Sequence, residues 1–295
     1  MKLVISKLSK TYPNGVQALK NISLTLANGM FGLLGPNGAG KSSLMRTIAT
    51  LQEADEGTVY LDDLDVLNNK TKVRQLLGYL PQEFGVYPRI SAEQMLDHVA
   101  KLKGVSNPGE RRELVDALLD NVNLFEYKKR KLGTFSGGMK QRFGIAQALV
   151  GNPKLIIVDE PTAGLDPAER NRFYNLLSHL GENTIVILST HIVEDVSTLC
   201  AEFAIISQGE LLYTGTPDAA IHEMDGNIYS KAIEKNDLAG YKSRFSLIST
   251  QLKAGKLSIR IFSEQDPGGQ FNAVTPTLED IYFRYAGTKA EINTF

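Results

Sequence analysis

Two stretches of small residues, each followed by a helical pattern, have the composition of a phosphate-binding site. Residues 35–42 read GPNGAGKS, and residues 135–139 read FSGGM and lead into a stretch of good helix formers. The first N–H groups of a helix lack intrahelical partners, and together with the helix dipole they attract anions such as phosphate. The sequence therefore predicts two anion-binding segments in one chain, which raises the question of why both are needed.

The first stretch matches the pattern G-x-x-x-x-G-K-S/T, and its surroundings are those that this pattern requires. It follows a short apolar strand at 30–34 and opens a predicted helix at 42–49. In this context Lys41 supplies a cation to the β- and γ-phosphates of a nucleotide, and the hydroxyl of Ser42 is a Mg²⁺ ligand. The predicted nucleotide-binding residues of the loop are Gly35, Pro36, Asn37, Gly38, Ala39, Gly40, Lys41, Ser42 and Ser43.

Two acidic residues, Asp159 and Glu160, stand at the end of the apolar strand LIIVD (155–159). An ionised carboxylate at the end of a buried strand is costly unless it is paired or lies near a metal. Beside a phosphate-binding loop, we expect Asp159 to join Ser42 in holding Mg²⁺ and Glu160 to polarise the water that attacks the γ-phosphate. The alternative is that these carboxylates only cap the following turn.

Three further residues are candidates because of their positions next to predicted strands. His191 follows TIVILST and could hold the attacking water and donate to the γ-phosphate. Gln82 follows a strand at 76–80 and a proline, and its amide could reach Mg²⁺ or the water. Tyr12, in SKTYPNG, could stack on an adenine. Taken alone, each of the three is equally compatible with a structural role.

The elements that must position these residues follow from the hydrophobic pattern. Residues 1–30 alternate with period two around a Pro-Asn-Gly turn, which predicts antiparallel strands, and 91–150 has a helical pattern opened by a near capping box at Ser91 and Gln94. LIIVD, TIVIL and FAIIS alternate with helical stretches, which is typical of a parallel sheet covered by helices on both faces. The predicted fold class is α/β, with a mainly parallel P-loop NTPase core, an N-terminal antiparallel β subdomain, a helical insert at about 88–150 and a small C-terminal α+β appendage. We place the domain boundary between 1–220 and 221–295.

The composition excludes several other classes of protein. The net charge is −1, so no global field points to nucleic acid, and we expect no nucleic-acid partner. The one cysteine, Cys200, rules out an internal disulfide and is typical of a reducing compartment. No apolar run approaches the roughly 20 residues of a spanning helix, so we expect no direct membrane insertion.

The motifs occur in an order that resembles the nucleotide-binding subunit of ABC transporters over about residues 1–220. They are, in chain order, Tyr12, GPNGAGKS (35–42), Gln82, FSGGM (135–139), LIIVDE (155–160), AGLD (163–166) and STH (189–191). The resemblance implies that the chain binds ATP with Mg²⁺ and hydrolyses it. It also implies that Tyr12 stacks on adenine and that Gln82, Glu160, His191 and Lys41 form the catalytic site. By the same resemblance Asp159, Ser42 and Gln82 hold the metal, and Asp166 belongs to the D-loop.

The resemblance also offers a reason for the second anion-binding segment. In this family two nucleotide-binding domains pack head to tail, so Ser136, Gly137 and Gly138 would face the ATP held by the loop of the other domain. We expect a second ATP-binding subunit, as a homodimer, although a paralogue is also compatible. The family's commonest signature is LSGGQ, and this chain departs from it at Phe135 and Met139.

SGGMKQR and the C-terminal TPTLEDIYFRYAG are similar to a bacterial subgroup that works with separate ABC-2 type permeases, mostly exporters. This similarity implies a separate transmembrane permease, received by a groove whose wall includes Glu83–Pro88, and a cytoplasmic, peripheral position on the inner face of the plasma membrane. An ATPase subunit of an importer and a non-transport ABC ATPase remain the alternatives.

Overall fold

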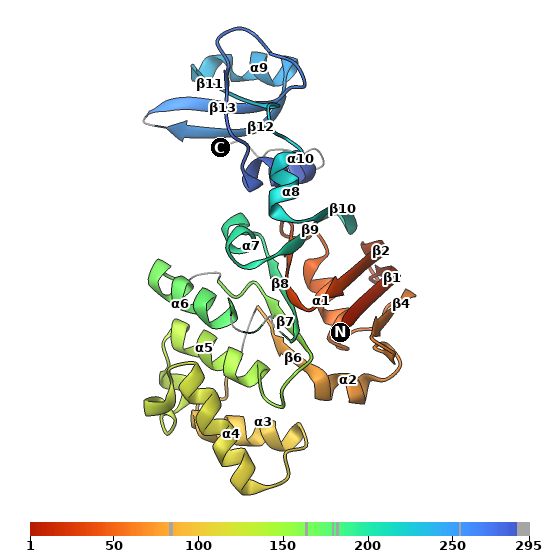
Figure 1. Ribbon diagram of the computed structural model, residues 1–295, viewed down its shortest axis with the longest axis vertical. Coiled ribbons are helices and arrows are strands. Elements are labelled where there is room, and N and C mark those ends of the chain that lie inside the picture. Colours follow the sequence, from red (N-terminus) through yellow and green to blue (C-terminus); the bar gives the residue numbers. More distant parts are fainter. Residues whose placement is uncertain (83–84, 163–164, 179, 181–182, 254, 288–295) are drawn as a thin grey trace.

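The computed structural model describes residues 1–287 except 83–84, 163–164, 179, 181–182 and 254 (Figure 1). Its centre is a six-stranded sheet of order β10-β9-β3-β8-β7-β6. The strands are β3 (Gly29–Leu34), β6 (Leu77–Leu80), β7 (Leu155–Asp159), β8 (Ile185–Thr190), β9 (Glu202–Ser207) and β10 (Glu210–Gly215). All neighbours pair in parallel except β9 and β10, which confirms the predicted, mainly parallel sheet.

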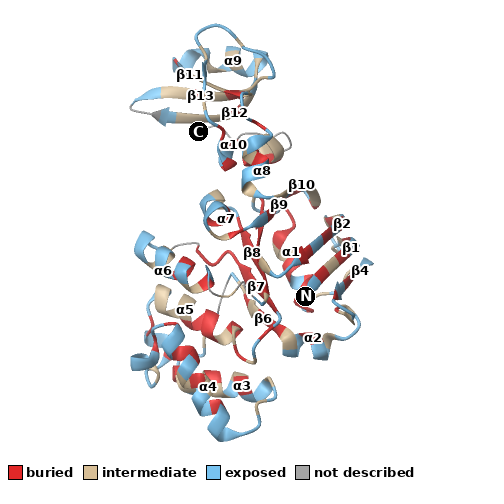
Figure 2. Cartoon of the chain, in the orientation of Figure 1, coloured by how far each residue is buried: buried red, intermediate tan, exposed pale blue. Residues whose placement is uncertain are grey.

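The two faces of this sheet contact different layers, because successive side chains of a strand point to opposite sides. Phe31 and Leu33 of β3 pack with α1 (Lys41–Ile48) and with a four-stranded antiparallel sheet of order β2-β1-β4-β5. The strands of that second sheet are β1 (Lys2–Thr11), β2 (Gln17–Ala27), β4 (Glu56–Leu61) and β5 (Leu64–Asp65), and α2 (Lys70–Leu76) leads from it into β6. Helix α1 therefore lies between two sheets, and the buried residues of both are seen in Figure 2.

The other face of the central sheet is covered by helices. Met30 and Leu34 belong to a cluster that includes residues of α5 (Gly137–Ala148), α6 (Pro167–Ser178) and α7 (Val193–Leu199). The insert adds α3 (Ala92–Leu102) and α4 (Pro108–Asn121), with short 3-10 turns at Phe125–Tyr127 and Leu132–Thr134. The predicted capping box is present, since Ser91 Oγ accepts from Gln94 N and Gln94 Oε1 accepts from Ser91 N.

The C-terminal region forms a second small unit at one end of the molecule, opposite the helical insert (Figure 1). Its antiparallel sheet has the order β12-β13-β11-β14. The elements are α8 (Pro217–His222), β11 (Ile228–Ile233), a 3-10 turn (Lys235–Asp237), α9 (Leu238–Arg244), β12 (Ser246–Lys253), β13 (Lys256–Phe262), β14 (Asn272–Ala273) and α10 (Leu278–Gly287).

Helix α10 does not stay with this small sheet alone. Its apolar residues Leu278 and Ile281 join the same buried cluster as Phe203 of β9. Arg260 of β13 pairs with Asp280 of α10 through two contacts of 2.7 and 2.6 Å, and Asp280 is almost completely buried. The predicted boundary near residue 220 falls at α8, and α10 then returns to contact the core.

Candidate functional site

The loop between β3 and α1 can adopt its shape only with glycine at two positions. A Cβ on Gly35 would lie 2.3 Å from the backbone oxygen of Ile206. Gly40 has φ +108° and a Cβ there would lie 2.4 Å from the backbone oxygen of Ala18. Gly40 is also the residue from which α1 starts, so the loop delivers Lys41 and Ser42 to the first turn of this helix. The two glycines therefore let the loop pack against the backbones of β9 and β2 and lead directly into α1, whose first N–H groups can bind an anion.

Three of the four residues predicted as catalytic converge on the carboxylate of the fourth, Glu160. Lys41 Nζ lies 3.4 Å from Glu160 Oε1. Gln82 Nε2 donates to Glu160 Oε2 at 3.0 Å, and His191 Nδ1 lies 3.2 Å from the same oxygen. These residues come from α1, from the segment after β6 and from the ends of β7 and β8. The parallel sheet brings together groups that are far apart in the sequence, since its strands end at one edge.

Glu160 has a backbone conformation that an L-residue rarely adopts. Its φ is +47°, in the left-handed region, and its side chain is buried. Its N–H donates to Ser189 O at 2.8 Å, which continues the pairing of β7 with β8 by one residue. Such strain costs about 1–3 kcal/mol and persists only where the surroundings enforce it, most often at functional sites.

The electrostatics of the loop are set by one buried cation between two acids. Burial lowers the pKa of Lys41, whereas the nearby Glu160 and Asp159 carboxylates raise it and partly offset the effect of burial. Lys41 Nζ also donates to Gly35 O at 2.7 Å and to Pro36 O at 3.2 Å. These contacts hold the amine at the mouth of the glycine loop, where a phosphate would meet it.

The fit of this site to Mg²⁺ depends on Asp159. Its side chain is 3% exposed, and within the described ranges its Oδ1 atom has no hydrogen-bond partner. A buried acceptor of this kind is costly unless a ligand satisfies it. No group of three or more His, Cys, Asp and Glu side chains in the described part of the chain could hold a metal. Mg²⁺ commonly takes one or two carboxylates and completes its shell with substrate phosphates and water, so Asp159 and the Ser42 hydroxyl suit it.

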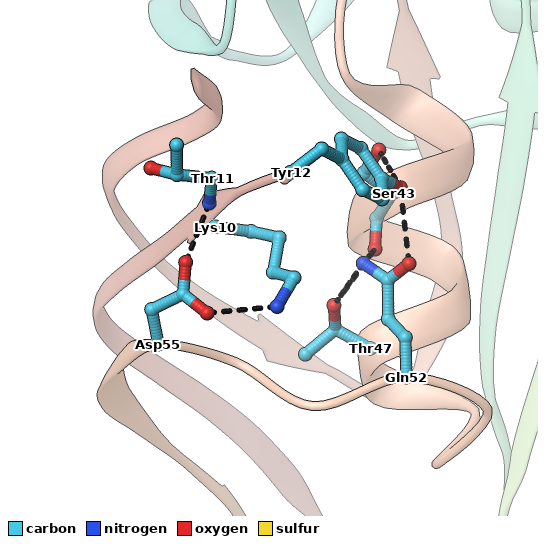
Figure 3. Close-up of polar contacts among 7 residues, drawn as sticks. All are labelled: Lys10, Thr11, Tyr12, Ser43, Thr47, Gln52 and Asp55. Atoms are coloured by element: carbon cyan, nitrogen blue, oxygen red, sulfur yellow. Dashed lines mark hydrogen bonds and ion pairs between the residues drawn. The ribbon is translucent and has the colours of Figure 1, made fainter. Parts of the chain in front are cut away.

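Tyr12 is held by its hydroxyl group at the end of β1 (Figure 3). It donates to Gln52 Oε1 at 3.1 Å and lies 3.0 Å from Ser43 Oγ. A phenol has one proton, so the Ser43 hydroxyl is the donor in the second contact. Gln52 Nε2 in turn donates to Thr47 Oγ1 and Ser43 O, both at 2.9 Å. The aromatic ring is thereby tied to the first turns of α1.

The chain just before Tyr12 is also fastened. Asp55 accepts from Lys10 Nζ at 2.7 Å and from Thr11 N at 2.6 Å (Figure 3). The Lys10 ammonium and the Thr11 N–H lower the pKa of Asp55, because both stabilise the carboxylate. The sequence did not reveal Gln52 as a partner of Tyr12, or Asp55 as a partner of Lys10 and Thr11, since a polar residue in a connecting loop carries no pattern of its own.

The second anion-binding segment lies apart from the first. Ser136 is the N-cap of α5, and its Oγ accepts from Met139 N at 3.2 Å. Ser136 and Gly137 are exposed. Across the described residues, no hydrogen bond or ion pair joins Ser136, Gly137 or Gly138 to the loop at 35–43. Asp166 is likewise exposed, and it caps α6 by accepting from Glu169 N at 2.8 Å. The structure therefore brings the predicted catalytic residues together, whereas the Ser136 segment and Asp166 lie apart from them.

One buried acid was not predicted at all. Asp195 in α7 is completely buried and accepts hydrogen bonds from three hydroxyl groups. It follows Glu194, which is exposed, and nothing in the local sequence distinguishes the two acids.

Within the described residues, none of the helices has the length and apolar character needed to cross a membrane.

Comparisons with known proteins agree with the site. The profile of the family described as "ABC transporter" matches residues 19–163. The chain is 38% identical over 211 residues to "Linearmycin resistance ATP-binding protein LnrL" of Bacillus subtilis, covering 71% of this chain and 68% of that protein.

Two further similarities extend the comparison. The chain is 30% identical over 303 residues to "Probable multidrug ABC transporter ATP-binding protein YbhF" of Escherichia coli, covering 97% of this chain and 52% of YbhF. The solved structure "Dimeric structure of a post-hydrolysis state of the ATP-binding cassette MJ0796 bound to ADP and Pi" matches with a TM-score of 0.67 and 28% identity. It covers 72% of this chain and 98% of the cassette. The chain therefore belongs to the ATP-binding proteins of the ABC transporter family, and it binds and hydrolyses ATP.

Proposed function

We propose that this protein is the motor subunit of an ABC exporter, which hydrolyses ATP at a head-to-tail dimer interface and drives a separate permease. The observation that carries the proposal is the convergence of Lys41, Gln82 and His191 on Glu160, with the Ser136 segment exposed and apart from it. A second copy would supply the missing side of each nucleotide site. LnrL is named for resistance and YbhF for multidrug transport, which favours export over import.

In this proposal the residues around the γ-phosphate divide the tasks of catalysis and metal binding. Glu160 accepts a proton from the water that attacks the γ-phosphate, and His191 and Gln82 hold its carboxylate in place. Lys41 exchanges its contact with Glu160 for the phosphates when ATP binds. Gln82 faces Glu160 through Nε2, which leaves its Oε1 for a metal together with Asp159 and Ser42. Mg²⁺, when bound there, supplies positive charge to the phosphates.

The Ser136 segment is suited to a nucleotide held by another subunit. The Ser136 hydroxyl accepts from Met139 N, and its own proton is left for a phosphate oxygen. Gly137 and Gly138 present backbone N–H groups at the start of a 12-residue helix, α5. Charge-assisted hydrogen bonds of this kind contribute about 1.5–3 kcal/mol each. ATP can therefore stabilise a closed dimer that opens again after hydrolysis.

We propose an ABC-2 type permease as the membrane partner and a peripheral position on the inner face of the plasma membrane. The proposed docking wall spans residues 83–88. Glu83 and Phe84 lie outside the described residues, whereas Tyr87 is 64% exposed and offers an aromatic contact. Such a wall begins directly after Gln82, so a permease bound there would be coupled to the nucleotide site.

Capture of the partner from membranes tests the proposal. A tagged Glu160→Gln variant is expressed in the organism from which the protein comes, and the membranes are solubilised in detergent. The variant is captured by its tag with and without ATP, and the proteins retained with it are identified by mass spectrometry. We expect a multi-span membrane protein in stoichiometric amount. Retention of ribosomal proteins or DNA with no membrane protein would contradict the transport function, and a partner that is an importer's permease would contradict export.

A further inference from the structure

Asp195 is a buried charge that the proposed hydrolysis does not use. Its side chain is 0% exposed, in α7 behind the edge of the sheet that bears the site. Among the described residues, no cationic side chain forms an ion pair with it. Its carboxylate is satisfied instead by three hydroxyl groups, from Thr162, Tyr174 and Thr190. Burial of a carboxylate costs free energy unless hydrogen bonds replace those it made with water. Because the three hydroxyl groups supply these bonds, their positions are fixed relative to Asp195.

Two of the three donors flank the catalytic residues. Thr162 follows Glu160 by two residues, and its Oγ1 donates to Asp195 Oδ2 at 2.7 Å. Thr190 immediately precedes His191, and its Oγ1 donates to the same oxygen, also at 2.7 Å. One carboxylate oxygen therefore joins the segment that carries Glu160 to the segment that carries His191.

The hydroxyl of Thr190 has a second contact that brackets His191. It accepts from Ile192 N at 3.0 Å while it donates to Asp195. The backbone on both sides of His191 is thus tied to one hydroxyl group. The third donor, the Tyr174 hydroxyl, reaches Asp195 Oδ1 at 2.5 Å from α6 and anchors the carboxylate from the opposite side.

We infer that Asp195 is a positioning residue for ATP hydrolysis. It holds the segment after β7 and the end of β8 in one arrangement, so that Glu160 Oε2 and His191 Nδ1 remain at the 3.2 Å seen here. Asp195 acts through Thr162 and Thr190, and it contacts neither of the two catalytic side chains. This inference rests on the roles proposed for Glu160 and His191.

Matched substitutions of the two threonines distinguish positioning from packing. Valine keeps the shape of threonine and removes the hydroxyl, whereas serine keeps the hydroxyl and removes a methyl group. Both sites are 1% exposed, so a packing role predicts that serine is the more harmful change. The positioning role predicts the opposite order in kcat.

The assay is steady-state ATP hydrolysis by the full chain, measured well below the melting temperature of each variant. We expect Thr162→Val and Thr190→Val to lower kcat at least ~10-fold, with KM for ATP changed by less than about twofold. The reason is that misplacement of Glu160 and His191 slows the chemical step and leaves ATP binding unchanged. Thr162→Ser and Thr190→Ser should keep kcat within about twofold of the unmodified protein. Because the two hydroxyls share one oxygen, the double valine variant should lose less than the product of the single losses.

Thr184→Val is the matched control. Thr184 immediately precedes β8 and its hydroxyl donates to Pro153 O at 3.4 Å, away from Asp195, so kcat should not change. Valine variants that keep normal kcat, or serine variants that lose more than the valine variants, would overturn the inference. Glu160→Gln is measured in parallel. If Glu160→Gln still hydrolyses ATP normally, the proposed catalytic site is wrong. If Glu160→Gln is inactive but the valine variants are fully active, only the role inferred for Asp195 is refuted.

Discussion

The ion pair between Lys41 and Glu160 predicts that loss of the carboxylate strengthens nucleotide binding while it abolishes turnover. Two unit charges at the observed 3.4 Å attract each other by about 5 kcal/mol at an effective dielectric constant of about 20. Desolvation of two buried groups offsets most of this attraction. ATP must replace Glu160 as the partner of Lys41, and its γ-phosphate must approach the negative carboxylate.

In Glu160→Gln, ATP no longer has to displace a carboxylate from Lys41, and its γ-phosphate no longer approaches a negative charge. The side chain changes little in shape. A net gain of about 1–2 kcal/mol corresponds to roughly 5- to 30-fold tighter binding of the triphosphate. Hydrolysis should fall at least ~10²-fold, as expected for loss of a general base. Binding is measured by calorimetry with a non-hydrolysable ATP analogue and Mg²⁺, so that both proteins meet the same ligand, and turnover by phosphate release.

Two control variants separate charge from other effects. Glu194→Gln removes an exposed carboxylate that is paired with Arg170, and its affinity should stay within about twofold. His191→Ala should slow hydrolysis without tightening binding, because it removes no negative charge. Equal affinity of Glu160→Gln and the unmodified protein would refute the exchange of partners at Lys41, and normal turnover would refute the assignment of Glu160.

Three other predictions concern different parts of the chain. Tyr12→Ala should weaken ATP binding by about 1–3 kcal/mol in the same calorimetric assay, because the stacking surface is lost. Tyr12→Phe keeps the ring and should keep most of the affinity, so equal losses in the two variants would contradict stacking. Arg260→Ala leaves the buried Asp280 carboxylate without its cation and with only the N–H and hydroxyl of Thr277 as donors. It should lower the free energy of unfolding by about 3 kcal/mol in urea, and an unchanged midpoint would contradict this prediction. Burial, with a smaller contribution from Asp195, raises the pKa of Cys200 to about 12. A thiol reagent at pH 8 should therefore label Cys200 far more slowly in the native protein than in the unfolded protein, and equal labelling rates would contradict this prediction.

The P-loop and the ends of the central strands could be predicted because their chemistry is local. A glycine loop between an apolar strand and a helix has few other uses, and acids at strand ends are costly without a partner. The parallel sheet followed from apolar segments such as LIIVD, which became β7, and the edge of that sheet is what brings Glu160 and His191 together.

Other features depend on contacts that no local pattern encodes. Helix α10 carries an apolar stripe that includes Leu278 and Ile281, but such a stripe does not tell which surface it covers. The helix packs on β9 as well as beside its own sheet. Asp195 and Glu194 are adjacent acids, and only the fold decides that one is buried against hydroxyl groups and the other faces solvent. The hydroxyl contacts of Tyr12 with Ser43 and Gln52 likewise arise from the packing of α1 against β1 and β2.

The claim that each ATP site is completed by a second subunit is tested most directly by sedimentation of the Glu160→Gln variant. With ATP and Mg²⁺ the variant should sediment as a dimer, and without nucleotide or with ADP as a monomer. Replacement of Ser136 by a bulky acidic residue, as in Ser136→Glu, should abolish the ATP-induced dimer while a single chain still binds the nucleotide. A variant that binds ATP tightly and remains a monomer at every protein concentration would contradict the composite site.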